Sequence, residues 1–280
     1  MSKTRGFTSL EMKTSNQRKF LTGFTLVELL VVIAIIALLM SILMPALGRV
    51  RKQAKTVMCQ LNLRQWGIIF SMYTGDYDGF FHKGWGIGPV RHWMAVLRPY
   101  YSNEQKLRFC SMATKPRSEG GSGVTSAWGI FPGGWAGGGE DDFGSYGINS
   151  WVCNTPEGEE HYGPPERYWR TVNVKNAANA PLFLDAWWFD GWPKFRDPPN
   201  EFEDMYLTGG SLEAMGDFCV NRHGGFLNGL FLDFSVRKIG IKELWKLKWH
   251  RTFDTEGPWT IAGGVDPGDW PQWMRKLKDY

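Results

Sequence analysis

The chain has 280 residues, of which 43% are hydrophobic, and this length and composition are sufficient for one sizeable globular domain or two small ones. The formal net charge is +4, and the residues before Phe24 account for it, because this stretch holds five basic side chains against one acidic side chain, Glu11. The rest of the chain is formally neutral. It gives no support for the concentrated basic surface that nucleic-acid binding normally requires, so we expect no nucleic-acid partner.

An apolar segment follows the basic stretch. Between Phe24 and Leu47 the only charged side chain is Glu28, and a helix rising about 1.5 Å per residue needs roughly 20 apolar residues to cross the hydrocarbon core. The sequence therefore predicts one membrane span over residues 24–47. The basic residues before it favour a cytoplasmic N-terminus and a C-terminal part outside the cytoplasm. Four basic residues after the span weaken that signal: Arg49, Arg51, Lys52 and Lys55.

The order of the N-terminal segments differs from that of a secretory signal. In a secretory signal the apolar part precedes the cleavage site and is discarded, whereas here a polar leader ends at Gly23 and the apolar part follows it. Cleavage after Gly23 would leave the apolar helix on the mature chain. The segment GFTLVELLVVIAIIALL resembles the cleavage and methylation signature of type IV prepilins and of the pseudopilins of type II secretion systems.

The resemblance implies a role for each matched residue. Residues 1–23 would be a cytoplasmic leader that prepilin peptidase removes, with Gly23 before the scissile bond and Phe24 as the new, N-methylated N-terminus. Glu28 matches the glutamate five positions into the mature chain. Pro45 matches the proline that interrupts the pilin helix, where we expect a kink. The implied partners are prepilin peptidase, other pseudopilin subunits, the secretion or pilus assembly machinery and the bacterial inner membrane.

The charge of Glu28 needs a physical reason, because an ionised carboxylate inside a bilayer costs about 2.5 to 3.5 kcal/mol on insertion scales. Under the resemblance, Glu28 pairs with the Phe24 ammonium of a neighbouring subunit, so that both charges are neutralised and the register of helix stacking is set. The alternative is that Glu28 lies near the cytoplasmic end of the span and only reaches interfacial water.

Helical periodicity continues beyond the span. Apolar residues at spacings of three, four or seven predict an amphipathic helix whose apolar stripe packs on a folded domain: Leu47, Val50, Ala54, Val57, Leu61, Ile68 and Met72. The helix is expected to end near Tyr73, with Gly75 as the stop signal. The predicted segments are the leader, the membrane half of the helix, its outer half and a periplasmic or extracellular head: residues 1–23, 24–47, 48–75 and 76–280.

The predicted head domain has a different composition. Gly, Pro and Trp dominate and apolar runs are short, so long loops should connect few strands. Three segments have strand-like patterns, and the last alternates well enough for a half-buried strand after a turn: Trp93–Leu97, Pro181–Phe189 and Leu227–Ile239. We predict an α+β fold in which an antiparallel sheet packs on the outer half of the long helix.

Short segments of the head resemble a large pseudopilin-like family of planctomycetes and related bacteria. The segments CQLNLRQWGIIFSMYTGDYDGFF, RFC, SYGIN and FLDA occur in the order found there. Further on, RHGGFLNGLFLDFSV is similar to a motif in which nine residues separate a histidine from Asp-Gly. His223 and Asp233 keep that spacing, but Phe234 replaces the glycine. Because phenylalanine does not take positive φ as glycine does, we expect a somewhat different hairpin turn.

Asp185, His223 and Asp233 are the candidates for chemistry. If they were adjacent they would form a small metal site or an acid–base pair, whereas the favoured alternative is that His223 and Asp233 bond to loop backbone and fix the strand ends. Residues 76–79, DYDG, resemble the opening of a calcium loop but lack its later ligands and predict a polar turn. Because no P-loop, dinucleotide fingerprint, zinc-protease motif or nucleophile elbow is present, we predict a protein that is not an enzyme and has no metal site, with calcium as the one cofactor left open.

The cysteines are consistent with export. Cys59, Cys110, Cys153 and Cys219 are even in number, follow the predicted span and lack the close spacing of zinc sites. We predict disulfides and prefer Cys59 with Cys110, because both lie in segments that resemble the pseudopilin-like family and a bridge there would tie the helix to the head. Buried free thiols are the alternative.

The 15 tryptophans raise a second function. The segments Ala186–Trp192 and Lys246–Phe253 place aromatic beside polar side chains, as do surfaces that stack on sugar rings. Such a surface would make the protein a membrane-anchored adhesion or carbohydrate-binding module with a glycan as its partner. Burial of most tryptophans in the core is the ordinary expectation, and the sequence favours a pseudopilin-like subunit.

Overall fold

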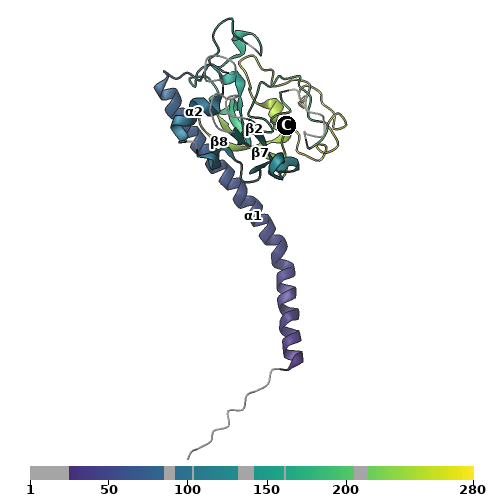
Figure 1. Ribbon diagram of the computed structural model, residues 1–280. Coiled ribbons are helices and arrows are strands. Elements are labelled where there is room, and N and C mark those ends of the chain that lie inside the picture. The colour runs from purple at the N-terminus through teal and green to yellow at the C-terminus, as the bar shows by residue number, and fades with distance from the viewer. Residues whose placement is uncertain (1–24, 85–91, 103, 132–141, 161, 205–213) are drawn as a thin grey trace, which may run out of the picture. The chain divides into compact units, whose positions relative to one another are not determined.

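The computed structural model describes residues 25–84, 92–102, 104–131, 142–160, 162–204 and 214–280. The chain divides into two compact units, of which the first ends at Arg49 and the second is Val50–Tyr280. Helix α1 (Leu26–Asp76) supplies residues to both units, and the second unit adds helix α2 (Trp93–Tyr101) and two β-sheets (Figure 1).

A five-stranded sheet in the order β6-β4-β5-β7-β8 is the larger of the two. Its strands are β4 (Tyr146–Asn149), β5 (Pro181–Asp185), β6 (Asp190–Gly191), β7 (Phe226–Phe231) and β8 (Val236–Gly240). The smaller sheet has β1 (Lys115–Pro116), β2 (Ser126–Phe131) and β3 (Asp142–Gly144). The predicted α+β class is confirmed, with one correction: β4 pairs with β6, and β1 with β2, in parallel, while the other pairs are antiparallel.

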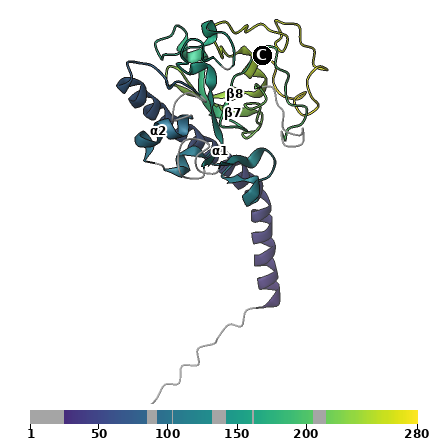
Figure 2. The ribbon, with the colours of Figure 1, turned by 45° about the horizontal axis from the view of Figure 1, so that its top comes forward.

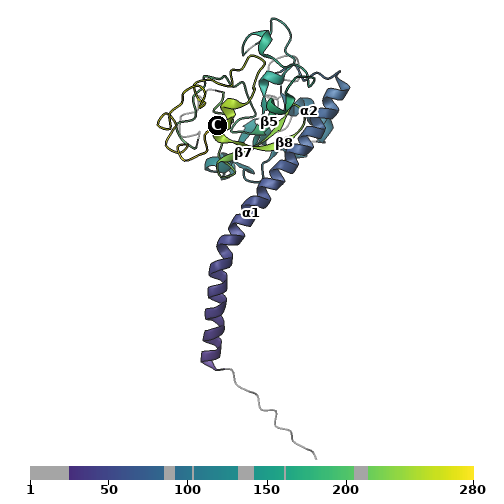
Figure 3. The same cartoon turned by 180° about the vertical axis from the view of Figure 1, so that it is seen from behind.

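The two faces of the five-stranded sheet support two hydrophobic cores, because successive residues of a strand point to opposite sides. Phe183 of β5 and Leu230 of β7 join the core that contains residues of α1 and α2. Their neighbours Leu184 and Phe231 join a second core with the segment that follows β8. Figure 3 shows α2 and the outer part of α1 on one side of the strands and the C-terminal segment on the other.

The face of α1 that packs on the sheet is not the predicted one. The buried face is made by residues at alternating spacings of four and three: Cys59, Leu63, Trp66, Phe70 and Tyr73. The Trp66 ring meets the Trp93 ring of α2 edge-on at a centroid distance of 5.2 Å. The large residues of the predicted stripe are instead 50% to 61% exposed: Leu47, Val50, Val57, Leu61, Ile68 and Met72. The helix ends at Asp76, one residue after the predicted stop at Gly75.

The predicted strands were correct only in part. Trp93–Leu97 is the beginning of α2, because its buried side chains, with Tyr101, recur at helical spacing. Pro181–Phe189 is extended only as far as Asp185. Leu227–Ile239 is the β7–β8 hairpin rather than one strand, and the two strands lie side by side in Figure 2.

Candidate functional site

The beginning of α1 carries the residues singled out for processing and assembly. Gly23 and Phe24 lie outside the described residues. The Glu28 N–H donates to Thr25 Oγ1 at 3.2 Å, while Glu28 Oε2 accepts hydrogen bonds from the N–H and the hydroxyl of Thr25, both at 2.8 Å. This reciprocal pattern is a capping box, which satisfies backbone donors that a helix start leaves unpaired. Glu28 therefore stabilises the first turn of its own helix.

The part of α1 that follows Glu28 has the properties of a membrane anchor. Among the described residues, α1 is the one helix long and apolar enough to cross a membrane, and none of its most apolar stretch is buried. Pro45 lies within the helix, which continues beyond it to Asp76. A kink at Pro45 stays a prediction.

Asp185 and His223 meet in a buried cluster in the second unit. β5 ends at Asp185, and His223 lies three residues before the first residue of the antiparallel neighbour β7, so the strand pairing brings them together. His223 Nε2 lies 3.3 Å from Asp185 Oδ2 and 3.3 Å from Cys110 Sγ. Its other ring nitrogen, Nδ1, lies 3.0 Å from Thr56 Oγ1 on α1. The favoured prediction that the His223 side chain bonds to loop backbone was wrong.

Opposite charges surround the Asp185 carboxylate. Burial alone would raise its pKa, but His223 and Arg222 outweigh burial and hold that pKa below its usual range. Burial alone would lower the pKa of His223, but the hydrogen bond and charge of Asp185 raise it to about 9. Arg222 is buried, with Nη1 3.6 Å from Asp185 Oδ1. Its guanidinium also donates to four main-chain carbonyls, those of Val124, Ser126, Ser145 and Ala186.

Two of the four cysteines belong to this cluster. Cys59 on α1 and Cys110 have Sγ atoms within 4.8 Å of each other and of ligand atoms of Asp185 and His223. A hydrogen bond from Cys110 lowers the pKa of the Cys59 thiol to about 5, while burial raises the pKa of Cys110 well above its ordinary value.

The predicted disulfides are not present, because all four cysteines are buried free thiols. The preferred pair, Cys59 and Cys110, is nevertheless brought together, whereas the other two lie apart from the cluster. Cys153 has its Sγ 4.0 Å from His82 Nε2. Cys219 belongs to the second hydrophobic core. Burial raises the pKa of both thiols.

Asp233 does not join the cluster. It lies in the β7–β8 turn, at the other end of β7 from His223, is exposed and accepts a hydrogen bond from the Ser235 N–H at 2.9 Å. Phe234, the next residue, has φ of 61°. The expectation that phenylalanine would avoid positive φ was therefore wrong. Phe234 packs against the first core beside Gly67 of α1, and this contact offsets the backbone strain.

The segment that resembled a calcium loop forms the turn that ends α1. Asp76 Oδ2 accepts a hydrogen bond from the Tyr100 hydroxyl at 2.8 Å. The Gly79 N–H donates to the Thr74 carbonyl at 2.7 Å. Asp76 is thus engaged by Tyr100, and the φ of 83° at Gly79 accounts for the glycine in this turn.

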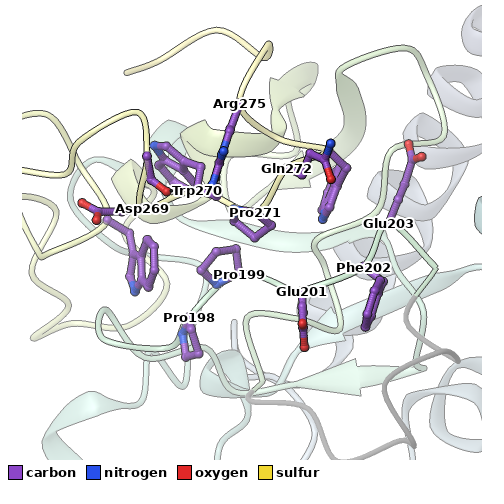
Figure 4. A pocket seen from close by; sticks show the side chains of 13 residues that line it. Pro198, Pro199, Glu201, Phe202, Glu203, Asp269, Trp270, Pro271, Gln272 and Arg275 are labelled. Carbon is purple, nitrogen blue, oxygen red and sulfur yellow. Dashed lines mark hydrogen bonds between the residues drawn. The ribbon is translucent and has the colours of Figure 1, made fainter.

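The tryptophans are mainly core residues. None of those in the described part of the chain is exposed, and eight are fully buried: Trp66, Trp93, Trp128, Trp151, Trp187, Trp245, Trp249 and Trp270. Near the C-terminus a cavity of about 670 Å³ combines aromatic and charged side chains (Figure 4). Its lining includes Trp259, Trp270, Trp273, Glu201, Asp269 and Arg275. It is the part of the described surface that best fits the glycan hypothesis.

The sequence-based candidates omitted Thr56 and Arg222. Thr56 lies three residues before Cys59 on the same helix face, a spacing that could have indicated it. Arg222 adjoins His223, but nothing in the sequence indicates that its guanidinium is buried against Asp185.

Comparison with known proteins bears on the N-terminal segment. The model of the family described as the prokaryotic N-terminal methylation motif matches residues 22–44. No curated protein and no solved structure matches the chain. The N-terminal segment thus carries the motif of type IV prepilins and pseudopilins, as its residues indicated.

Proposed function

We propose that the chain is the precursor of a pilin-like subunit, which prepilin peptidase cleaves after Gly23 and which assembles through α1 into a pseudopilus or a type IV pilus-like fibre. The observation that carries this proposal is the coincidence of the methylation motif at residues 22–44 with a helix whose apolar side chains are exposed along most of its length. The protein is then a structural subunit rather than an enzyme.

Within the second unit, the exposed face of α1 offers a surface for assembly. We define the outer stripe as the exposed apolar residues Val50, Val57, Leu61, Ile68 and Met72 of α1, which the sheet leaves uncovered. An apolar stripe of this length is typical of an interaction surface. A second copy of α1 fits it, because parallel helices of identical subunits present the same spacing to each other.

Glu28 supports the same proposal. Its capping bonds use Oε2, so the Phe24 ammonium of a neighbouring subunit would approach Oε1. That pairing neutralises two charges that would otherwise be costly among apolar helices. Before assembly, the same helix anchors the precursor in the inner membrane with the second unit on the periplasmic side, which protease accessibility in spheroplasts would test.

Processing is the direct test. The full chain is co-expressed with a prepilin peptidase and the mature N-terminus is identified by mass spectrometry. We expect a product that begins at N-methylated Phe24, and no cleavage of Gly23→Val, because the added branched side chain obstructs the scissile position. The matched control Gly6→Val changes the same residue type in the leader and should be processed normally. Cleavage at another bond, or equal processing of the two variants, would contradict the proposal.

A second candidate function, glycan binding, is favoured by the C-terminal cavity. Trp259 and Trp273 are half-buried there, beside carboxylates and Arg275, and sugar sites use this combination of ring faces and polar groups. The test is a titration with defined oligosaccharides, in which tryptophan fluorescence reports binding. Saturable binding that Trp259→Ala abolishes would support this function, and it is compatible with a fibre subunit.

A further inference from the structure

We propose that Cys59, Cys110, Asp185 and His223 bind one Zn²⁺ ion in a buried, four-coordinate site. The four residues each offer one ligand atom, and these atoms all lie within 4.8 Å of one another. Three of the residues are buried, and the side chain of the fourth, His223, is 1% exposed. Neither the methylation motif nor the proposed assembly function requires such a site.

The spacing of the ligand atoms fits a tetrahedron. With zinc bonds of about 2.0 to 2.3 Å, tetrahedral geometry separates a nitrogen from an oxygen ligand by about 3.3 Å and a nitrogen from a sulfur ligand by about 3.6 Å. The distances from His223 Nε2 are 3.3 Å to Asp185 Oδ2 and 3.3 Å to Cys110 Sγ. Small side-chain adjustments therefore suffice to place an ion among them.

The surroundings of His223 set the orientation that a metal ligand needs. Thr56 Oγ1 donates its hydrogen to the Lys52 carbonyl at 3.0 Å, so toward His223 Nδ1, at 3.0 Å, it acts as the acceptor. The Nδ1–H of His223 is thereby fixed on Thr56, and Nε2 faces Asp185 and Cys110. In zinc-binding histidines, the ring nitrogen that does not bind the metal regularly donates its N–H to a nearby polar group.

The remaining ligands have similar support. The Ser111 N–H donates to Cys59 Sγ at 3.1 Å, an arrangement that stabilises a thiolate. The Asn228 N–H donates to Asp185 Oδ2 at 2.8 Å. Asp185 Oδ1 lies 3.6 Å from Arg222 Nη1, so Oδ2 is the oxygen that lies next to His223 Nε2.

The charge balance also permits a divalent cation. Two thiolates, a neutral imidazole and a carboxylate carry three negative charges, of which Zn²⁺ neutralises two. Arg222, with Nη1 3.6 Å from Asp185 Oδ1, lies beside the remaining charge. Two thiolates with an imidazole favour zinc over calcium, which prefers oxygen ligands.

The site would connect four segments of the second unit. Cys59 comes from α1, Cys110 from the loop before β1, Asp185 from the end of β5 and His223 from the segment before β7. Structural zinc sites stabilise folds in this way, because the unfolded chain does not hold the ligands together. The ion would do what the sequence assigned to a disulfide: it would fix the helix to the sheet.

The experiment uses the full chain in detergent, purified with a reductant and stripped of metal by a chelator. It is then titrated with ZnCl₂ against a chromophoric chelator, and zinc per chain is measured by elemental mass spectrometry. Replacement by CoCl₂ reports geometry, because tetrahedral cobalt with thiolate ligands has intense visible and charge-transfer absorption. The variants are Cys110→Ser and His223→Gln for the ligands and Thr56→Val for the group behind His223. Cys219→Ser is the matched control, since Cys219 is buried outside the cluster.

We expect one zinc ion per chain, the tetrahedral cobalt spectrum and an increased Tm on zinc addition. Cys110→Ser and His223→Gln should lose the ion, Cys219→Ser should keep it, and Thr56→Val should weaken binding roughly 10- to 100-fold. Since a ligand variant can misfold, the wild-type cobalt spectrum and Thr56→Val serve as independent readouts. Folded wild-type protein that binds no zinc would overturn the proposal and leave a simple His223–Asp185 ion pair. A Cys59–Cys110 disulfide in protein isolated from the periplasm without reductant would also overturn it.

Discussion

Thr25 and Glu28 cap the first turn of α1 reciprocally, with the Glu28 N–H donating to the Thr25 hydroxyl oxygen at 3.2 Å and the Glu28 carboxylate accepting from the Thr25 N–H at 2.8 Å. The carboxylate at the beginning of an otherwise apolar helix thus has a role before any neighbour arrives. The hydrogen bonds of Glu28 stabilise the helix, and its charge is proposed to act in assembly. Different substitutions remove each of these two contributions.

Glu28→Gln should preserve the cap and remove the charge, because glutamine also serves at the third position of a capping box. We expect normal membrane insertion and peptidase cleavage but fewer assembled fibres, since an amide does not neutralise the Phe24 ammonium of a neighbour. Cross-linking of sheared fibres, beside a blot of the membrane fraction, measures both. The complementary variant Thr25→Val keeps the charge, should cost about 1 kcal/mol of helix stability and should still assemble. Equal assembly of Glu28→Gln and the parent would leave Glu28 with the capping role alone.

Leu61→Glu tests the outer stripe. Leu61 is 50% exposed, so the free energy of unfolding of the subunit should change by no more than about 0.5 kcal/mol. Assembly should fall strongly, because each subunit contact would bury an unpaired carboxylate. The comparison is Leu63→Ala, two residues along on the buried face, which should destabilise the subunit by about 2 to 5 kcal/mol. Chemical denaturation and fibre yield distinguish the two effects. Full fibre yield from Leu61→Glu would show that other surfaces mediate assembly.

The two faces of α1 explain one limit of sequence-based prediction. One apolar series runs through Val57, Leu61 and Ile68, and another through Leu63, Trp66 and Phe70, and both have helical spacing. Periodicity identifies the helix but does not indicate which series meets the sheet. The choice depends on fit, because the Trp66 ring fills space between Trp93 and Phe183, and these partners are distant in sequence.

The buried cluster shows what resemblance and pattern can supply. The motif identified His223, and the segment FLDA drew attention to Asp185. The predicted pairing of Cys59 with Cys110 identified two residues that do lie close together, although they are free thiols and not a disulfide. Asp233 was included only because it shares the motif, and the length of β7 separates it from His223. Spacing along a strand predicts on which face or at which end of the strand a residue lies. The approach of Asp185 and His223 to Cys59 of α1 depends instead on contacts between segments that are distant in sequence.

Phe234 provides a test of backbone strain. Its φ of 61° lies in the left-handed region, where a non-glycine residue costs roughly 1 to 2 kcal/mol. Phe234→Gly and Phe234→Ala both remove the ring and its packing. The difference between their free energies of unfolding therefore isolates the cost of positive φ for a residue with a Cβ atom. We expect the glycine variant to be the more stable of the two by about 1 kcal/mol, measured by chemical denaturation. A more stable alanine variant would mean that the turn changes conformation when the ring is removed.

His82 should make the second unit sensitive to acid. Its side chain is buried, its Nδ1 accepts a hydrogen bond from the Gly84 N–H at 3.1 Å, and burial lowers its pKa to about 4. The unfolded chain binds a proton near pH 6.5 and the folded chain does not, so the free energy of unfolding should fall as the pH decreases from about 6.5 to 4, by up to about 1.4 kcal/mol per pH unit for this group.

His250 contributes with the same sign, because burial also lowers its pKa, to about 3. His82→Gln retains an acceptor for Gly84 and should reduce the slope relative to the parent, and the double variant with His250→Gln should reduce it further. Burial raises the pKa of Asp190 to about 7 and also raises that of Asp217, so these carboxyls contribute with the opposite sign in parent and variants alike. Urea denaturation at several pH values between 4.5 and 7 measures the slope. His223, whose pKa is raised to about 9, contributes with the opposite sign as the pH rises through 6.5, and this contribution is the same in the parent and the variants. An unchanged slope in both variants would mean that neither imidazole stays neutral in the folded protein, which conflicts with their burial.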